Sequence, residues 1–231
     1  MTRSLTRFLR RLSRHTSGVA MTEFALIFPF ILGVGLMGME TANRVLVQMK
    51  VAQLASQIAD NASRIGDQSM LEDRKIYEGD INDLFYGAWM QGGDSIDLYR
   101  HGRVILSSLE VVPDTEDQQY IHWQRCLGMK NHVSSYGIEG DGRTSDDLPG
   151  MGPAGEEVTA FADGAVMFVE ISYDYQPLIG APLTFNEGDI HVISSFTVRN
   201  DRDLTRIYQR SSTNPDPVAR CDTYGNVSAT G

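Results

Sequence analysis

Residues 18–24, Gly-Val-Ala-Met-Thr-Glu-Phe, stand between an arginine-rich leader and a long apolar run. No charged residue occurs from Phe24 to Met39, and the apolar run that starts at Val19 has the ~20 residues that a bilayer requires. A carboxylate within such a helix is unfavourable in lipid, by roughly 2.5–3.5 kcal/mol at the helix centre. The stretch therefore predicts one membrane-spanning helix in which Glu23 needs a partner or a function.

The leader, residues 1–18, indicates how this helix is oriented. It contains five arginines and no acidic residue. Because the cytoplasmic flanks of membrane helices are enriched in Lys and Arg, we expect a cytoplasmic leader and a remainder that faces the other side of the membrane. A secretory signal peptide fits less well. The apolar run exceeds the about 7–15 residues of an h-region, and Glu40 would occupy the −3 position of a cleavage site after Ala42.

The helical pattern continues beyond the apolar run. Apolar residues recur at spacings of three and four up to Ile65, which indicates one helical face, and Gly66 is typical of a residue that ends a helix. A helix from Val19 to Ile65 would be about 70 Å long. We expect four segments: a basic leader at 1–18, a transmembrane helix at 19–40, a helical stalk at 41–66 and a periplasmic domain at 67–231.

Gly18 and Val19, followed by Glu23-Phe24-Ala25-Leu26-Ile27-Phe28-Pro29-Phe30, resemble the N-terminal segment of the TadE-like pseudopilins of the tight-adherence (Tad/Flp) type IV pilus system. That family has a glycine, four further residues, Glu-Phe-Ala, and then apolar residues around a proline. Residues 166–178, which end in Tyr-Gln-Pro-Leu, resemble a late strand of the family. The Asp-x-Ser-x-Ser metal motif of the longer TadG-like relatives does not occur, so the resemblance implies the short form.

The resemblance implies a role for each residue of the N-terminal motif. A prepilin peptidase would cut after Gly18 and leave Val19 with a free and often methylated amine. Glu23, with Phe24 after it, would pair with the amine of a neighbouring subunit when the helices bundle. In such a bundle, burial of a carboxylate next to an ammonium group is less unfavourable than burial of either charge alone.

The function that the resemblance implies is that of a minor pseudopilin that primes or joins a Tad pilus at the inner membrane, with a link to adhesion. Its partners would be the prepilin peptidase, other Tad pilus subunits, assembly-platform proteins and inner-membrane lipid. An alternative is an uncleaved single-pass membrane protein that presents a periplasmic binding domain. A membrane-tethered hydrolase is a third interpretation, which would need a convergent set of catalytic side chains in a cleft.

The charge of the chain argues against nucleic acid as a partner. Residues 19–231 contain 15 lysines and arginines against 30 aspartates and glutamates, because the leader holds five of the 20 basic residues. An excess of negative charge disfavours binding to phosphate backbones and is typical of a solvated surface. Roughly 165 residues follow Gly66, which suits a single domain of ~100–200 residues.

The pattern of this domain predicts an α+β fold, in which a long N-terminal transmembrane and stalk helix precedes an antiparallel sheet and a shorter helix. We expect four or five strands, and an irregular loop at 138–157 that is rich in Gly, Asp, Pro and Ser. The predicted elements are a helix at Ile76–Met90 and strands at Ile96–Tyr99, Val104–Val112, Tyr120–Leu127, Ala165–Tyr175 and His191–Arg199.

The two cysteines, Cys126 and Cys221, both lie on the predicted outer side. In an oxidising periplasm we expect them to form a disulfide. A metal or catalytic thiol is the alternative, but neither belongs to a Cys-x-x-Cys pair, and the nearby His122 and His132 are more typical of surface or satisfied core histidines.

No catalytic residue, metal or cofactor is expected. The chain has no His-Glu-x-x-His, Gly-x-Ser-x-Gly, phosphate-loop or Gly-x-Gly-x-x-Gly motif, and its histidines form no spaced pair on one helix. Residues 141–147, Asp-Gly-Arg-Thr-Ser-Asp-Asp, could attract calcium. They lack the register and the distal glutamate of a calcium loop, which favours a solvated loop.

Overall fold

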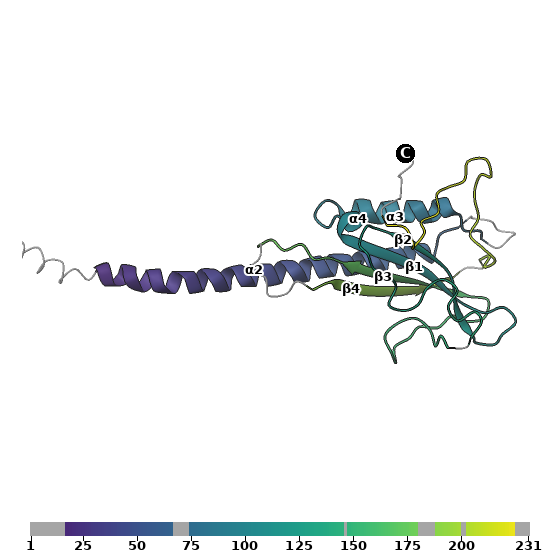
Figure 1. Ribbon diagram of the computed structural model, residues 1–231, viewed down its shortest axis with the longest axis horizontal. Coiled ribbons are helices and arrows are strands. Elements are labelled where there is room, and N and C mark those ends of the chain that lie inside the picture. The colour runs from purple at the N-terminus through teal and green to yellow at the C-terminus, as the bar shows by residue number, and fades with distance from the viewer. Residues whose placement is uncertain (1–16, 67–73, 146, 180–187, 200–201, 225–231) are drawn as a thin grey trace, which may run out of the picture. The chain divides into compact units, whose positions relative to one another are not determined.

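A 46-residue helix and a four-stranded antiparallel sheet are the main elements of the described chain (Figure 1). The computed structural model describes residues 17–66, 74–145, 147–179, 188–199 and 202–224. The expected α+β fold is confirmed at this level. The elements are α2 (Ser17–Ala62), α3 (Glu78–Gly92), α4 (Leu98–His101), β1 (Gly102–Val111), β2 (Gln119–Leu127), β3 (Ala165–Tyr173) and β4 (Ile190–Thr197).

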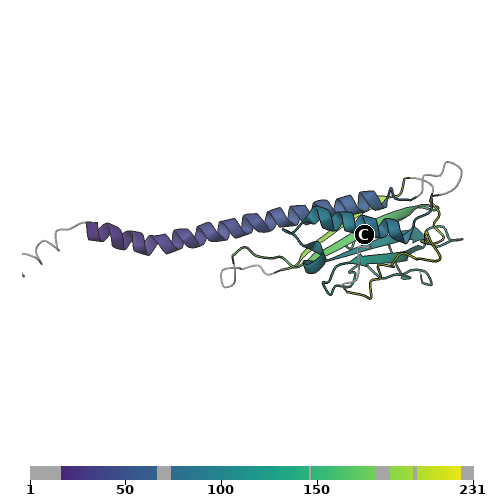
Figure 2. The ribbon, with the colours of Figure 1, turned by 90° about the horizontal axis from the view of Figure 1, so that it is seen from above.

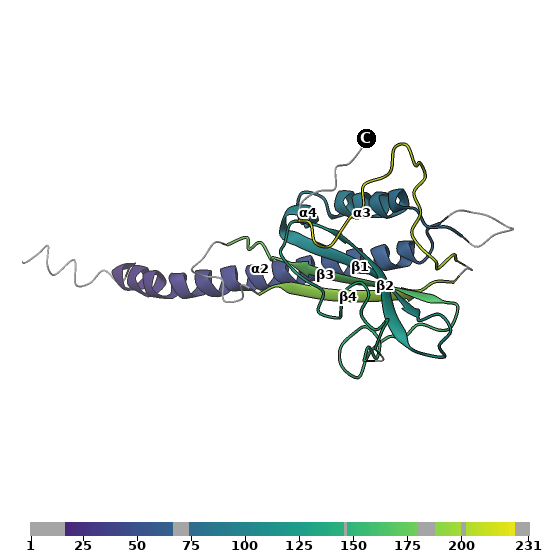
Figure 3. The ribbon, with the colours of Figure 1, turned by 45° about the vertical axis from the view of Figure 1, so that its right-hand side comes forward.

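The strands lie in the order β2-β1-β3-β4, so β1 and β3 form the centre of the sheet (Figure 3). Ile105 of β1 lies opposite Cys126 of β2 on one side and opposite Glu170 of β3 on the other. Every residue of β3 is buried, which means that both faces of the sheet are covered. This explains why the strand reads as a nearly continuous apolar run, Ala-Val-Met-Phe-Val-Glu-Ile-Ser-Tyr.

One face of the sheet packs against the C-terminal half of α2 and against α3 (Figures 1 and 2). Leu54 and Ile58 of α2 and Phe85 of α3 are at most 2% exposed and lie in one cluster with Leu106 and Val169 of the sheet. Burial of such a side chain stabilises the fold by about 1.5–3 kcal/mol. The helical face that the sequence indicated is therefore a face of the domain core.

The chain divides into two compact units, and the division differs from the predicted segments. Described residues 17–45 and 177–179 form one unit, in which the backbone N–H of Ile179 donates to Glu40 Oε2 at 3.0 Å. The other unit begins at Leu46. Residues expected to form a separate stalk belong largely to the domain instead, because their apolar face is buried against the sheet.

The opposite face of the sheet is covered by the long segment between β2 and β3. Phe168 and Ile121 of the sheet cluster there with Met151 and Ala160, and all four are buried. The loop predicted at 138–157 is irregular as expected, but it is packed as well as solvated. Hydrogen bonds fasten it to β2, since Ile121 N–H donates to Asp141 O at 2.9 Å.

The helix predicted at Ile76–Met90 is α3, Glu78–Gly92, and the predicted ranges differ more clearly at one strand and at the end of α2. The strand expected at Ile96–Tyr99 does not form. Asp97 has a φ of 42° and its side chain accepts a hydrogen bond from Arg100 N, which starts the short helix α4. Helix α2 ends at Ala62, and Arg202 Nη2 donates to the carbonyl oxygens of Ala62 and Ile65 at 3.1 and 2.8 Å. A cation at a helix C-terminus also interacts favourably with the helix dipole.

Two glycines of the packed loop allow its contact with β2 to be tested. Gly142 (φ +81°) and Gly140 (φ +96°) both have left-handed backbones, but only at Gly142 would an added Cβ meet a neighbour, the carbonyl oxygen of Gln119 at 2.2 Å. Gly140→Ala should destabilise by roughly 1–2 kcal/mol through backbone strain alone. Gly142→Ala should cost about 1–3 kcal/mol more, because the backbone oxygen must move.

The measurement is urea unfolding of the detergent-solubilised full chain, followed by tryptophan fluorescence, since Trp123 is buried in the sheet. Equal losses for the two variants would show that the loop does not press on β2 as described.

Candidate functional site

The predicted processing residues lie in the first turns of α2. Gly18 follows Ser17 directly, and the side chains of Val19 and Phe24 are 57% and 61% exposed. Glu23 is also exposed. The hydroxyl of Thr22 donates to the carbonyl oxygen of Val19 at 2.8 Å. A continuous helix therefore presents these groups at its beginning, where a glutamate side chain lies one turn after Val19.

Large apolar side chains are exposed around the whole N-terminal half of α2. A window of 18 residues within Gly18–Ala62 has a mean hydropathy of 2.0, and none of it is buried. A helix that is apolar on all sides is a core helix of a large protein or a membrane span. By length and composition α2 could cross a membrane, although a signal sequence near the N-terminus would meet the same two criteria. Its exposed large apolar residues before the domain are Val19, Met21, Phe24, Leu26, Ile27, Phe28, Phe30, Ile31, Leu32, Val34, Met37, Met39 and Val45.

Small and helix-breaking residues occur within the same half. Pro29 lies inside the helix, where it removes one backbone donor. A Cβ added at Gly33, Gly35 or Gly38 would meet nothing within 4 Å. These positions leave room for the close approach of another helix, as small residues do in membrane bundles.

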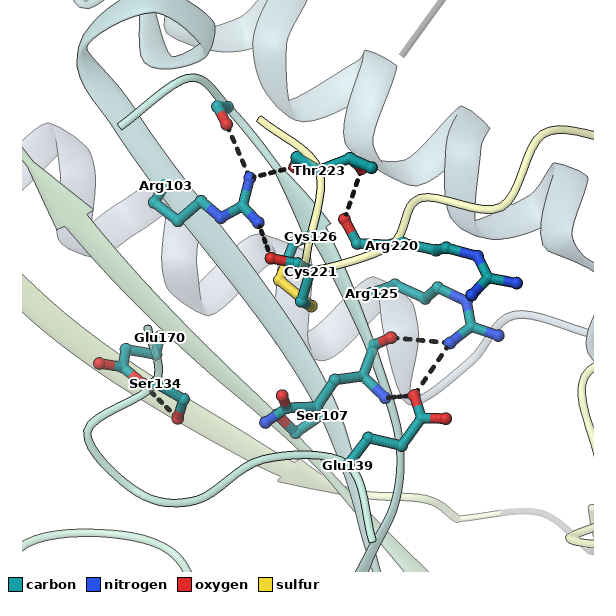
Figure 4. The surroundings of a disulfide bond; sticks show 12 residues. Arg103, Ser107, Arg125, Cys126, Ser134, Glu139, Glu170, Arg220, Cys221 and Thr223 are labelled. Atoms are coloured by element: carbon teal, nitrogen blue, oxygen red, sulfur yellow. Dashed lines mark hydrogen bonds and ion pairs between the residues drawn. A yellow bond between two sulfur atoms is a disulfide. The ribbon is translucent and has the colours of Figure 1, made fainter. Parts of the chain in front are cut away.

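The expected disulfide between Cys126 and Cys221 is present, with Cα atoms 4.9 Å apart (Figure 4). It joins β2 to the C-terminal segment, which has no regular secondary structure there. Beside it, the guanidinium of Arg103 donates to the carbonyl oxygens of Gly128, Thr223 and Cys221 at 2.8, 3.0 and 2.6 Å. One covalent and several charge-assisted contacts therefore hold this segment.

Arg103 is 1% exposed, and groups of the C-terminal segment surround its guanidinium. Burial lowers the pKa of its guanidinium, while the nearby Tyr224 and Asp222 act in the opposite direction. The ring of Tyr224 lies 4.4 Å from the guanidinium carbon. Carbonyl oxygens and an aromatic face compensate a buried cation that has no carboxylate in direct contact among the described residues.

A second buried charge, Glu170 of β3, lies on the outer face of the sheet under the segment after β2. Its Oε1 is 2.8 Å from His132 Nε2 and 2.7 Å from His191 Nε2. Ser134 Oγ donates to Oε2 at 2.8 Å, as Figure 4 shows, and Ser135 N–H lies 3.1 Å from both oxygens. Burial raises the pKa of Glu170, but these hydrogen bonds outweigh it and the net shift is downward.

Sequence reasoning did not find this cluster. His132 follows β2, Glu170 is in β3 and His191 is in β4, so no local spacing joins them. His132 was interpreted as a surface or core histidine, and so was His122, whose Nδ1 lies 2.9 Å from Glu110 Oε2. The only signal was a glutamate inside an otherwise apolar strand.

In the acidic stretch at 141–147, the side chain of Asp141 stabilises a local turn. Asp141 Oδ2 accepts a hydrogen bond from Ile138 N–H at 2.8 Å, which closes a turn. Asp146, which is part of the 141–147 stretch that could attract calcium, lies outside the described residues.

Comparison of the chain with protein-family models, with curated proteins and with solved structures gives no match. The residues of α2 and the geometry of the domain are therefore the basis for a functional proposal.

The disulfide should contribute strongly to the stability of the domain. Because it closes a loop of 95 residues, replacing both cysteines with serine should lower the free energy of unfolding by about 4–5 kcal/mol in the loop-entropy model. Urea unfolding of the full chain measures this loss. A reductant should destabilise the unsubstituted protein and leave the serine variant unchanged. Labelling of the denatured, unreduced protein by a maleimide would contradict the disulfide.

Proposed function

We propose that the chain is a structural subunit of a membrane-anchored assembly, a minor pseudopilin similar to TadE. It is cut after Gly18 by a prepilin peptidase and then primes or joins a Tad pilus at the inner membrane. One observation carries the proposal: α2 is a single helix that exposes apolar side chains on all sides over its first half and is built into the domain core over its second half.

The apolar half of α2 supports insertion into lipid followed by packing against other helices. Exposure of so many large apolar side chains to water would be unfavourable, by about 25 cal/mol per Å² of apolar surface. Lipid alone would satisfy these side chains but not Glu23. A neighbouring helix with a free terminal amine supplies the opposite charge, and the small residues of α2 permit a close approach.

The proposed partners follow from this arrangement. The prepilin peptidase acts on Gly18 and Val19, lipid surrounds the apolar half, and other Tad pilus subunits and assembly-platform proteins receive the helix after cleavage. The leader stays in the cytoplasm and the domain lies in the periplasm, since the five arginines precede the apolar run.

The second candidate function is that of an uncleaved single-pass protein with a periplasmic binding domain. A surface cavity of about 540 Å³ between the end of α2 and α3 favours it. Polar side chains from both helices line this cavity, among them Gln57, Asn61, Asp80 and Asp83. The fate of the leader separates the two candidates, because only the pseudopilin loses it.

Cleavage after Gly18 is the first test. Gly18→Leu should leave a full-length precursor in cells with an active prepilin peptidase, because a bulky side chain does not fit where the enzyme requires glycine. Gly33→Leu is the matched control: it places the same side chain in the same helix, at another position with open space, and should be processed normally. Intact mass spectrometry measures the N-terminus. An unsubstituted protein that retains Met1 would overturn the pseudopilin proposal and support the uncleaved alternative.

The charge of Glu23 is the second test. Glu23→Ala should leave insertion and cleavage largely intact but prevent incorporation into the pilus, because the amine of the neighbouring helix loses its partner. Thr22→Ala is the control, since it removes only a hydroxyl that bonds within the same helix. The measurements are piliation and co-purification with other Tad components. If the Glu23 variant matches the unsubstituted protein in both, Glu23 has no role in the filament core.

A further inference from the structure

Glu170, His132 and His191 bring three metal-binding side chains to one point on the outer face of the sheet. One nitrogen from each histidine and one oxygen from Glu170 all lie within 4.8 Å of one another. Both Nε2 atoms are directed at the same carboxylate oxygen, at 2.8 and 2.7 Å. Three separate segments of the chain therefore bring metal-ligating atoms together at one place.

We propose that these three side chains form a binding site for a divalent transition-metal ion of the zinc type. Two imidazole nitrogens and one carboxylate oxygen are a common set of protein ligands for Zn²⁺, with bond lengths of about 2.0–2.2 Å. A tetrahedral ion at that distance separates its ligand atoms by about 3.3 Å. Glu170 Oε1 lies 2.8 and 2.7 Å from the two nitrogens, about half an ångström less than this, and all three ligand atoms lie within 4.8 Å of one another, so the side chains must rotate to admit the ion.

The surroundings of Glu170 provide the second layer of contacts that metal sites need. Ser134 Oγ and Ser135 N–H bind the carboxylate, which fixes its plane and leaves Oε1 directed at the histidines. The ring of Tyr136 lies 6.0 Å from that of His191 and 5.3 Å from that of Phe168, and so forms a wall on one side. Hydrogen bonds of this kind orient ligands and raise affinity.

The three side chains are exposed to solvent to different degrees, which suits an ion that can exchange with solvent. The Glu170 side chain is only 1% exposed, whereas those of His132 and His191 are 21% and 34% exposed. The carboxylate therefore lies at the base of the site, and the histidines can turn at its rim. The fourth position of a tetrahedral ion would face this rim, where water or a side chain of another protein can bind it.

A carboxylate buried beside two histidines also gives an electrostatic reason for a cation. Without an ion, the groups that contact the Glu170 carboxylate are Ser134, the Ser135 N–H and the two imidazoles, all by hydrogen bonds. A dication would supply the opposite charge directly. The competing interpretation is that two imidazole N–H groups are sufficient and that no ion binds.

The experiment is a titration of the detergent-solubilised full chain with ZnCl₂ after treatment with a chelator, followed by isothermal calorimetry at neutral pH. The unsubstituted protein should bind one equivalent of Zn²⁺ per chain. His191→Gln should weaken binding by about tenfold or more, because it removes one ligand. It lies at the sheet edge and is partly exposed, so the variant should fold even if Glu170→Gln does not.

His122→Gln is the matched control, because His122 also bonds a buried glutamate, Glu110, but has no second histidine in that contact. It should bind Zn²⁺ as the unsubstituted protein does. Substitution of Co²⁺ for Zn²⁺ gives a second readout, a visible absorption band of a tetrahedral site that should be lost in His191→Gln. No binding of Zn²⁺, or equal binding by His191→Gln and the unsubstituted protein, would overturn the proposal.

Discussion

A helix satisfies its backbone hydrogen bonds internally, and this property allows α2 to serve two different surroundings along one continuous element. Its first half exposes apolar side chains in all directions, and its second half buries one face against the sheet. No irregular segment interrupts the helix between Ser17 and Ala62, so no backbone polar group needs an outside partner at the transition. Pro29 lies in the first half, where it removes one backbone donor from an otherwise continuous helix.

Burial of the sheet on both faces is the second determinant of the domain, and it imposes a partner on every charged residue in the strands. Glu110 is met by Ser108 and His122, at 2.6 and 2.9 Å. Arg202, which follows β4 and lies outside the strands, is buried as well but less completely matched: burial lowers its pKa to about 10, and its Nε and Nη1 atoms have no hydrogen-bond partner in the described part of the chain. Its remaining donor group closes the end of α2, so the unfavourable burial is offset by capping of that helix.

Local patterns predicted much of this fold. Alternating β-branched and aromatic residues identified β1 to β4 within two residues at each boundary, because these strands have the composition that suits a pleated, covered surface. The disulfide between Cys126 and Cys221 was expected from the presence of two cysteines on the predicted outer side of the membrane helix. The strand expected at Ile96–Tyr99 failed because the left-handed backbone of Asp97 starts a helix, a preference that apolar alternation does not reveal.

Sheet order is what the local patterns could not provide, and the candidate metal site depends on it. His191 lies near Glu170 only because β4 pairs with β3, and His132 reaches it only because the segment after β2 folds back across β1 to β3. The same limit explains the stalk prediction. The apolar face of residues 47–65 was visible in the sequence, but the sheet that covers it was not.

The row of residues that crosses the sheet at Ile105 links the disulfide to the Glu170 cluster. Cys126 lies opposite Ile105 on β2 and Glu170 lies opposite it on β3, so the two groups flank the same residue. Each fastens a segment without regular secondary structure, Cys126 through Cys221 and Glu170 through Ser134 and His132. Such segments lack the ladder hydrogen bonds that hold a strand, and they need attachments of another kind. A covalent bond at β2 and a charged cluster at β3 supply them, and both lie on the face of the sheet opposite α2 and α3.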